Sequence, residues 1–220
     1  MKLNNKRTIL VGLAFLSICA FWQMYDSIVP LILTKTFHMN ETFSGAIMAA
    51  DNILALFLLP FFGSVSDKSH SKLGKRMPFI LFGTGCAIIL MNILPLLDNS
   101  YAAQPSGFKT ASFVIVLGLL LVAMGTYRAP AVALMPDVTP KPLRSRANAI
   151  INLMGAVGGI LYLGVAAVLY PNSKTAGVEH VNYQPLFIVV SAIMFIAVAV
   201  LFLTIREPKL TAENQALEKQ

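Results

Sequence analysis

The chain has 220 residues, of which 56% are hydrophobic and only 12% are charged, and its mean hydropathy is +0.71. Soluble domains carry about 25% charged residues, so this composition excludes an ordinary water-soluble domain. Six membrane-spanning helices of about 20 apolar residues each would use about 120 residues, which is close to the apolar content of this chain. The net charge of +7 would suit nucleic acid only if the basic residues shared one soluble face, whereas here they lie between apolar runs. We therefore expect a membrane protein whose partner is the lipid bilayer, and no nucleic acid.

Six long apolar segments follow one another along the chain, separated by short polar or proline-containing stretches. Each is long enough to cross about 30 Å of hydrocarbon as an α-helix, and none shows the two-residue alternation of a membrane β-barrel. The sequence thus predicts an all-α fold, a polytopic bundle of six transmembrane helices. The predicted spans are residues 8–34, 42–65, 77–97, 110–134, 147–170 and 184–204.

Basic residues mark every second connection between the predicted spans. They are concentrated before the first span, in 66–76, in 141–146 and after the last span, while the other connections carry only Lys35, Lys109 and Lys174. Because positively charged loops stay on the cytoplasmic side, we predict that both termini are cytoplasmic. The expected location is the cell (plasma) membrane, as a multi-pass protein.

Three charged side chains lie well inside the predicted spans: Asp26, Asp51 and Arg128. Each would cost about 2.5–3.5 kcal/mol or more at the bilayer centre, so they should face the interior or a water-filled cavity. Asp51 lies near the middle of the second span and is a candidate proton carrier. With Asn52 it is also a candidate Na⁺ ligand, because hard cations prefer oxygen. Arg128 is a possible counter-charge to Asp51, either directly or through water, and a purely structural ion pair is the competing interpretation.

The first span carries a group of side chains suited to a sugar. Trp22 and Asp26 are four residues apart and share one helix face. An indole ring packs on the apolar face of a pyranose while a carboxylate accepts from its hydroxyls. Gln23 and Tyr25 add hydrogen-bonding groups, so all four are candidate substrate-binding residues. The alternative is an ordinary polar cluster.

The fifth predicted span carries two further candidate substrate-binding residues, Asn148 and Asn152, one turn apart. Gly155 and Gly159 follow on the same face, and this small-xxx-small spacing lets helices approach closely. Lining of a cavity and packing between helices are therefore both possible functions of this face.

The sequence shows no arrangement typical of an enzyme or a metal centre. There is no zinc-binding HExxH, no phosphate-binding glycine loop and no nucleophile elbow, and the three histidines are far apart. Cys19 and Cys86 both lie in apolar runs, where cysteine is a small buried side chain. We expect neither an enzyme nor a metal, and no cofactor apart from a coupling ion.

Two segments in register carry a resemblance to a known family. The first reads Gly63-Ser64-Val65-Ser66-Asp67-Lys68 and then Gly74-Lys75-Arg76-Met77-Pro78-Phe79. It resembles the loop between helices 2 and 3 of the major facilitator superfamily. Its long spacer and Pro-Phe ending are similar to the glycoside/cation (sucrose-type) symporter branch. The second block, similar to the helix 4–5 region of those carriers, comprises Arg128-Ala129-Pro130, Pro136-Asp137 and Arg146-Ala147-Asn148-Ala149.

This resemblance implies the N-terminal six-helix half of a twelve-helix carrier. Residues 1–204 would form two inverted three-helix repeats, about 8–97 and 110–204. Residues 205–220 would be a polar cytoplasmic tail resembling the start of a central loop. The partner would be a second six-helix half or a second copy in a homodimer, and a truncated or fragmentary product is also expected from the length.

The resemblance also implies a function: secondary active transport, specifically H⁺- or Na⁺-coupled symport of a small-molecule substrate such as a sugar or glycoside. A conformational latch at the cytoplasmic side would hold one transport state by charge-assisted hydrogen bonds. Its matched residues are Gly63, Asp67, Gly74, Lys75, Arg76 and Asp137. Two alternatives remain, a proton-driven drug exporter of the same superfamily and a non-transporting membrane scaffold or remnant.

Overall fold

The computed structural model describes residues 3–175 and 177–218. In this part of the chain six helices are long and apolar enough to cross a membrane, and no strand is present. The predicted all-α bundle with six spans is therefore confirmed. The long helices are α1 (Asn5–Leu31, continued by the π-helical turn η1, Ile32–Thr36), α2 (Glu41–Asp67), α3 (Met77–Ala103), α4 (Gly107–Val138), α5 (Arg144–Leu169, preceded by the 3₁₀ turn η2, Lys141–Leu143) and α7 (Gln184–Thr204). The short helices are α6 (Asn172–Thr175) and α8 (Glu207–Glu218).

Two helices continue well beyond their predicted ends. Helix α3 runs through the buried Asp98, and α4 runs through Pro136. The last four carbonyl groups of a helix have no partner within it and need other donors. Here Arg144 Nη2 donates to the carbonyl oxygen of Pro136 at 2.9 Å, and Asn214 Nδ2 donates to that of Asp137 at 3.1 Å. Proline was thus a poor guide to where this helix ends.

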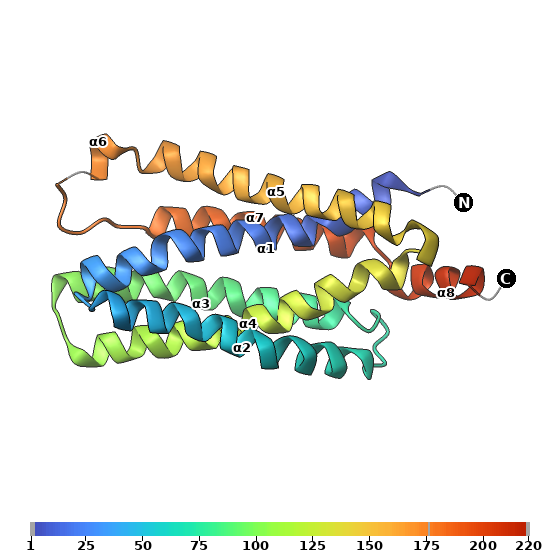
Figure 1. Cartoon of the computed structure of the whole chain (residues 1–220), viewed down its shortest axis with the longest axis horizontal. Coiled ribbons are helices and arrows are strands. Elements are labelled where there is room, and N and C mark those ends of the chain that lie inside the picture. The colour runs from blue at the N-terminus through green and yellow to red at the C-terminus, as the bar shows by residue number, and fades with distance from the viewer. Residues whose placement is uncertain (1–2, 176, 219–220) are drawn as a thin grey trace.

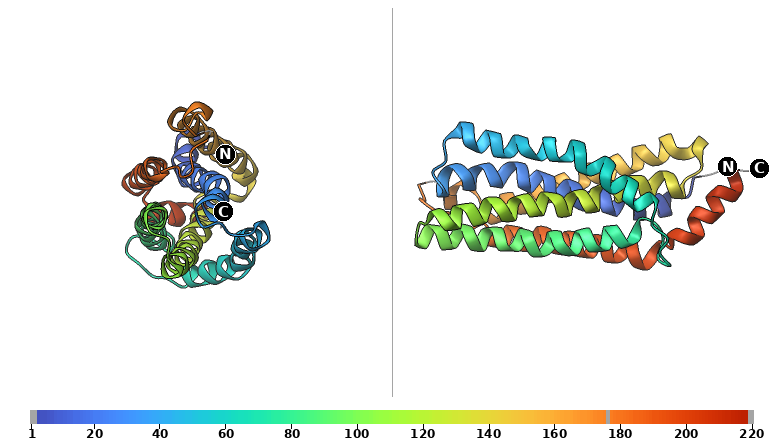
Figure 2. Two further views of the ribbon diagram at one scale, coloured as in Figure 1. Left: turned by 90° about the vertical axis from the view of Figure 1, so that its left-hand side faces the viewer. Right: turned by 90° about the horizontal axis from the view of Figure 1, so that it is seen from below.

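The six long helices lie side by side in two groups, α1, α5 and α7 in one and α2, α3 and α4 in the other (Figure 1). Helix α1 packs on α5 and α7, whereas α4 packs on α2 and α3, and α3 meets α7 between the groups (Figure 2). The first helix of each predicted repeat thus packs on the second and third helices of the other repeat.

Both ends of the described chain lie at the same end of the bundle, together with the connections 68–76 and 139–143 (Figure 1). We call this the basic end, because the clustered lysines and arginines lie there. The connections 37–40, 104–106 and 170–183 lie at the opposite end. Residues 207–218 of the predicted polar tail form helix α8.

Small residues set the spacing between α1 and α5. A side chain at Gly158 would overlap the backbone carbonyl of Leu16, and a Cβ at Gly155 would lie 2.9 Å from Cys19 Sγ. A Cβ at Gly159 would meet only Gln23 Oε1, at 3.9 Å. The close approach predicted for this helix is therefore made by Gly155 and Gly158 rather than by Gly159.

Buried hydroxyl and amide groups connect the helices further. Tyr127, fully buried on α4, hydrogen-bonds Ser17 Oγ at 2.6 Å and donates to the carbonyl oxygen of Ala14 at 3.1 Å, both on α1. Asn92 on α3 donates to Ser191 Oγ on α7 at 2.6 Å. These bonds span both groups of helices, so they hold the frame on which the functional residues are placed.

Gly158→Ala should lower the thermal unfolding temperature of the purified protein in detergent, because the added methyl group forces α1 and α5 apart. Overpacking of this kind costs about 1–3 kcal/mol. Gly164→Ala is the matched control on the same helix, since a Cβ there meets nothing within 4 Å. Equal unfolding temperatures for the two variants would contradict the proposed role of Gly158.

Candidate functional site

A small cavity of about 10 Å³ lies between α1, α2 and α4, near the middle of the bundle. This volume is about what one water molecule or ion needs. Its polar lining comes from one residue of each helix, Trp22, Asp51 and Arg128. The rest of the wall is apolar or small: Leu54, Ala55, Leu58, Leu59, Leu121 and Gly125. The structure therefore brings together three of the residues that the sequence nominated from three different spans.

Arg128 lies over the face of the Trp22 ring, with its guanidinium carbon 5.6 Å from the ring centroid. This is cation–π geometry. Tyr25 packs edge-on against the Trp22 ring, with the two ring centroids 5.3 Å apart. In the described part of the chain no hydrogen bond or ion pair joins Arg128 to Asp51, so the guanidinium is held by the indole rather than by a carboxylate.

Three buried polar atoms in this region have no hydrogen-bond partner: Trp22 Nε1, Tyr25 Oη and Asp51 Oδ1. An unsatisfied buried polar group costs about 1–3 kcal/mol, and native proteins keep few of them. Two donors and a carboxylate oxygen are a set that can bind a hydroxylated molecule, a proton or a small cation. The arrangement is thus suited to a polar ligand.

The other nominated residues lie around or away from this cavity. Asp26 and Asn52 are exposed, and Gln23 is half-buried against α5 near Gly159. Asn152 precedes Gly159 by seven residues, which places it about 10 Å nearer the basic end, and Asn148 lies one further turn away. Both asparagines are exposed, so the structure does not bring them to the Trp22 cluster.

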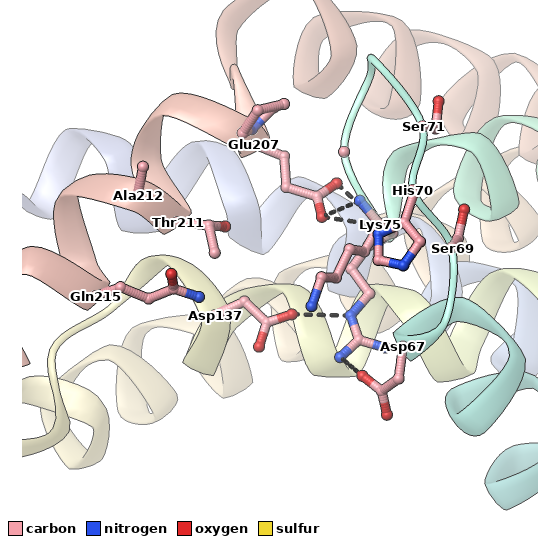
Figure 3. Close-up of a pocket in the computed structure, with 13 residues that line it drawn as sticks. Asp67, Ser69, His70, Ser71, Lys75, Asp137, Glu207, Thr211, Ala212 and Gln215 are labelled. Atoms are coloured by element: carbon pink, nitrogen blue, oxygen red, sulfur yellow. Dashed lines mark hydrogen bonds and ion pairs between the residues drawn. The ribbon is translucent and has the colours of Figure 1, made fainter.

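At the basic end one arginine joins three helices. The Arg76 side chain is only 6% exposed and lies between Asp67 at the end of α2 and Asp137 at the end of α4 (Figure 3). Its Nε donates to Asp137 Oδ2 at 2.8 Å, and its Nη2 donates to Asp67. Its Nη1 donates to Ser66 Oγ at 2.6 Å and to the carbonyl oxygen of Gly63 at 3.3 Å. Every donor group of this guanidinium therefore binds α2 or α4.

Glu207, the first residue of α8, binds the beginning of α3. Its carboxylate is buried and accepts from the backbone N–H groups of Lys75 at 2.7 Å and Arg76 at 2.9 Å (Figure 3). It also accepts from the backbone N–H of Met77 at 2.9 Å. A carboxylate at a helix N-terminus satisfies orphan donors and complements the helix dipole. Lys75 contributes to this network through its backbone N–H.

Gly74 is required beside this carboxylate. Its φ is +113°, a left-handed conformation that favours glycine, and a Cβ there would collide with the Glu207 carboxylate. Sequence reasoning nominated Gly74 but missed Glu207. A signal was present, because Glu207-Pro208 directly follows the last span, and proline is common in the first turn of a helix.

A second polar cluster, at the opposite end, was also missed. His180 Nε2 lies 2.9 Å from Asn99 Oδ1 and 3.9 Å from the fully buried carboxylate of Asp98, and its Nδ1 lies 3.3 Å from Thr36 Oγ1. The 177–183 connection is thereby attached to α3 and to the end of α1. His180 is far from its partners in sequence and meets them only through the fold.

Comparison with known proteins identifies the class. Residues 11–220 match the Major Facilitator Superfamily. The chain therefore belongs to this superfamily of membrane transporters, which confirms the predicted resemblance and the expectation that it is not an enzyme.

Three relatives narrow the comparison. The chain is 35% identical over 158 residues to the sucrose transport protein SUC3 of Arabidopsis thaliana, covering 66% of this chain and 26% of the relative. It is 36% identical over 154 residues to the sucrose transport protein SUT3 of Oryza sativa subsp. indica, covering 64% and 30%. It is 25% identical over 179 residues to the alpha-ketoglutarate permease of Escherichia coli (strain K12), covering 80% and 38%. The matches span about a quarter to two fifths of the length of these relatives.

Glu207→Gln should destabilise the protein, because the amide loses the charge that complements α3 and turns its NH₂ group toward backbone donors. We expect a loss of about 1–2 kcal/mol, measured as a lower thermal unfolding temperature in detergent. Glu213→Gln is the matched control on the same helix. The Glu213 side chain is 51% exposed, and its ion pair with Arg7 is long, at 4.0 Å. A Glu207→Gln variant as stable as Glu213→Gln would show that the carboxylate does not hold α8 to α3.

Proposed function

We propose that this chain is the N-terminal six-helix half of a cation-coupled sugar or glycoside symporter. The observation that carries the proposal is the central cavity, where a carboxylate oxygen of Asp51 and the indole N–H of Trp22 have no partner. The hydroxyl of Tyr25, which packs on Trp22, also has none. Membership of a transporter superfamily and the likeness to two sucrose transport proteins support it. The coupling ion is H⁺ or Na⁺.

In this proposal the polar and aromatic residues of α1 bind the sugar, whereas Asp51 on α2 has a different role. Trp22 and Tyr25, with Gln23 and Asp26 beside them, bind the sugar through ring stacking and hydrogen bonds to its hydroxyls. Asp51, near the middle of α2, binds the coupling ion. The three asparagines Asn52, Asn148 and Asn152 are exposed on α2 and α5. They contribute to sugar binding only when a second six-helix half or a second copy covers these helix faces.

The Arg76 network acts in this proposal as the latch of the basic end. Asp67, Arg76 and Asp137 connect the ends of α2, α3 and α4, and charge-assisted bonds of this kind are strong and directional. Opening of the carrier toward the basic end requires these bonds to break. Gly63 and Gly74 allow the backbone contacts, and Lys75 presents its N–H to Glu207.

The exposed helix faces fit a partner in the membrane. None of the most apolar stretch of α2 is buried, and only 22% of that of α5 is. A second six-helix half, or a second copy of this chain, would cover these faces. By the positive-inside rule the basic end faces the cytoplasm, with the protein in the plasma membrane.

An organic-acid carrier is the second candidate. Arg128 is a cation inside a span that binds no carboxylate in the described part of the chain, and one relative is by its name an alpha-ketoglutarate permease. Uptake of radiolabelled sucrose and of radiolabelled α-ketoglutarate into the same proteoliposomes distinguishes the two. The unpartnered polar atoms favour a sugar or organic-acid carrier over an exporter of apolar drugs. A chain that takes up neither substrate when paired with a second half would support the scaffold alternative.

Asp51→Asn should abolish gradient-driven sugar accumulation while leaving sugar exchange at equilibrium, because the amide keeps the shape of the carboxylate but cannot ionise. The measurement is uptake into proteoliposomes that contain this chain together with a second six-helix half, with and without an imposed proton or sodium gradient. Asp51→Asn that accumulates sugar as the unsubstituted protein does would place the coupling site elsewhere.

Asp26→Asn should have the opposite signature. Removing one acceptor of the sugar hydroxyls should raise the half-saturating sugar concentration about tenfold, as the loss of a hydrogen bond to a charged group predicts, while the dependence on the gradient persists. Unchanged half-saturation would remove Asp26 from the binding site.

A further inference from the structure

We infer that a groove at the basic end binds an anionic phospholipid. The groove has a volume of about 440 Å³ and lies between the 68–76 connection, the end of α7 and the beginning of α8. Its wall has a cationic part, formed by Lys72, Arg206 and Lys209, and an apolar part that includes Leu73, Phe202 and Leu203. This site is distinct from the central cavity and does not depend on what the protein transports.

The cationic part is uncompensated in the described residues. Lys72, Arg206 and Lys209 are all exposed, and their side chains form no hydrogen bond or ion pair with another described residue. The nearest acidic residue in sequence, Glu207, is only 2% exposed and is occupied by the backbone of α3. Three positive charges from two segments therefore converge on one groove, which favours an anion.

The apolar part indicates which anion. Phe202 and Leu203 directly precede Thr204, the last residue of the most apolar span, and they are 38% and 77% exposed. At this depth they meet the acyl region of the bilayer, while Arg206 lies one turn or less farther out, at the level of the headgroups. A free phosphate or nucleotide has no use for the apolar wall. A phospholipid matches both parts, with its phosphate at the cations and an acyl chain along Phe202 and Leu203.

Lipid binding here would reinforce the network at the basic end. Lys72 precedes the Gly74–Met77 segment that Glu207 binds, and Arg206 and Lys209 flank Glu207 itself. A bound headgroup would therefore hold the 68–76 connection against α8. The expected consequence is that anionic lipid stabilises the contact between α3 and α8.

Native mass spectrometry of the full chain, released from detergent, tests the site with phosphatidylglycerol, phosphatidylcholine and glycerol 3-phosphate as probes. We expect retention of phosphatidylglycerol in preference to phosphatidylcholine, with weak competition by glycerol 3-phosphate. A basic residue that contacts an anionic headgroup contributes about 1 kcal/mol, or about fivefold, so Lys72→Gln with Arg206→Gln should weaken binding by about 25-fold.

The matched control is Lys68→Gln with Arg146→Gln. It removes the same two charge types from exposed positions at the same end of the bundle, and neither residue lines the groove. We expect less than a twofold change. An equal loss in both double variants would reduce the effect to general surface attraction and overturn the site. Displacement of phosphatidylglycerol by equimolar glycerol 3-phosphate would overturn the role of the apolar wall.

A second measurement guards against loss of folding. Without lipid, both double variants should unfold at the temperature of the unsubstituted protein, because all four side chains are exposed. Added phosphatidylglycerol should raise the unfolding temperature of the unsubstituted protein and of the control, as binding to the folded state requires. An equal rise in the Lys72→Gln, Arg206→Gln variant would contradict the proposal.

Discussion

Hydrocarbon offers no hydrogen-bond partner to a peptide group, and this constraint governs most of what the chain does. It requires the six apolar segments to be helices. It also requires partners for the last carbonyl groups of α4, which Arg144 and Asn214 supply at Pro136 and Asp137. It also removes the hydrophobic force between helices, so contact depends on close fit. Gly155 and Gly158 supply that fit between α1 and α5, and Tyr127 binds α1 to α4.

The basic end and the middle of the bundle differ in whether their polar groups have partners. At the basic end Arg76 is saturated by α2 and α4, and Glu207 is saturated by the backbone of α3. The Arg76 cation and the Glu207 anion thus hold α2, α3, α4 and α8 together. In the middle of the bundle the opposite holds, because Asp51, Trp22 and Tyr25 retain polar atoms without partners. Saturated groups give the bundle its shape, and unsaturated ones are available for a ligand.

Helix α8 belongs both to the network at the basic end and to the proposed lipid groove. It begins two residues after the end of the most apolar span. Glu207 is buried against α3, whereas Lys209 and the preceding Arg206 are exposed. The segment 206–209 therefore binds α3 through Glu207 and lines the proposed lipid groove with Arg206 and Lys209. The proposed lipid site and the proposed latch share this segment, so a change in one is expected to be felt by the other.

The sequence alone determined the six helices and the shared side of the two termini, because hydrophobic length and the placement of basic loops are local properties. Its resemblance to the superfamily nominated Asp67, Arg76 and Asp137, which the structure joins. It also identified Asp51, Trp22 and Arg128 as unusual, since charge or indole inside an apolar run is visible without a structure. Only the tertiary structure decided that Arg128 lies over Trp22 rather than against Asp51, that Asn148 and Asn152 lie away from that cluster, and that Glu207 and His180 matter. These are contacts between residues far apart in the chain, and their geometry depends on how helices pack, which no local pattern encodes.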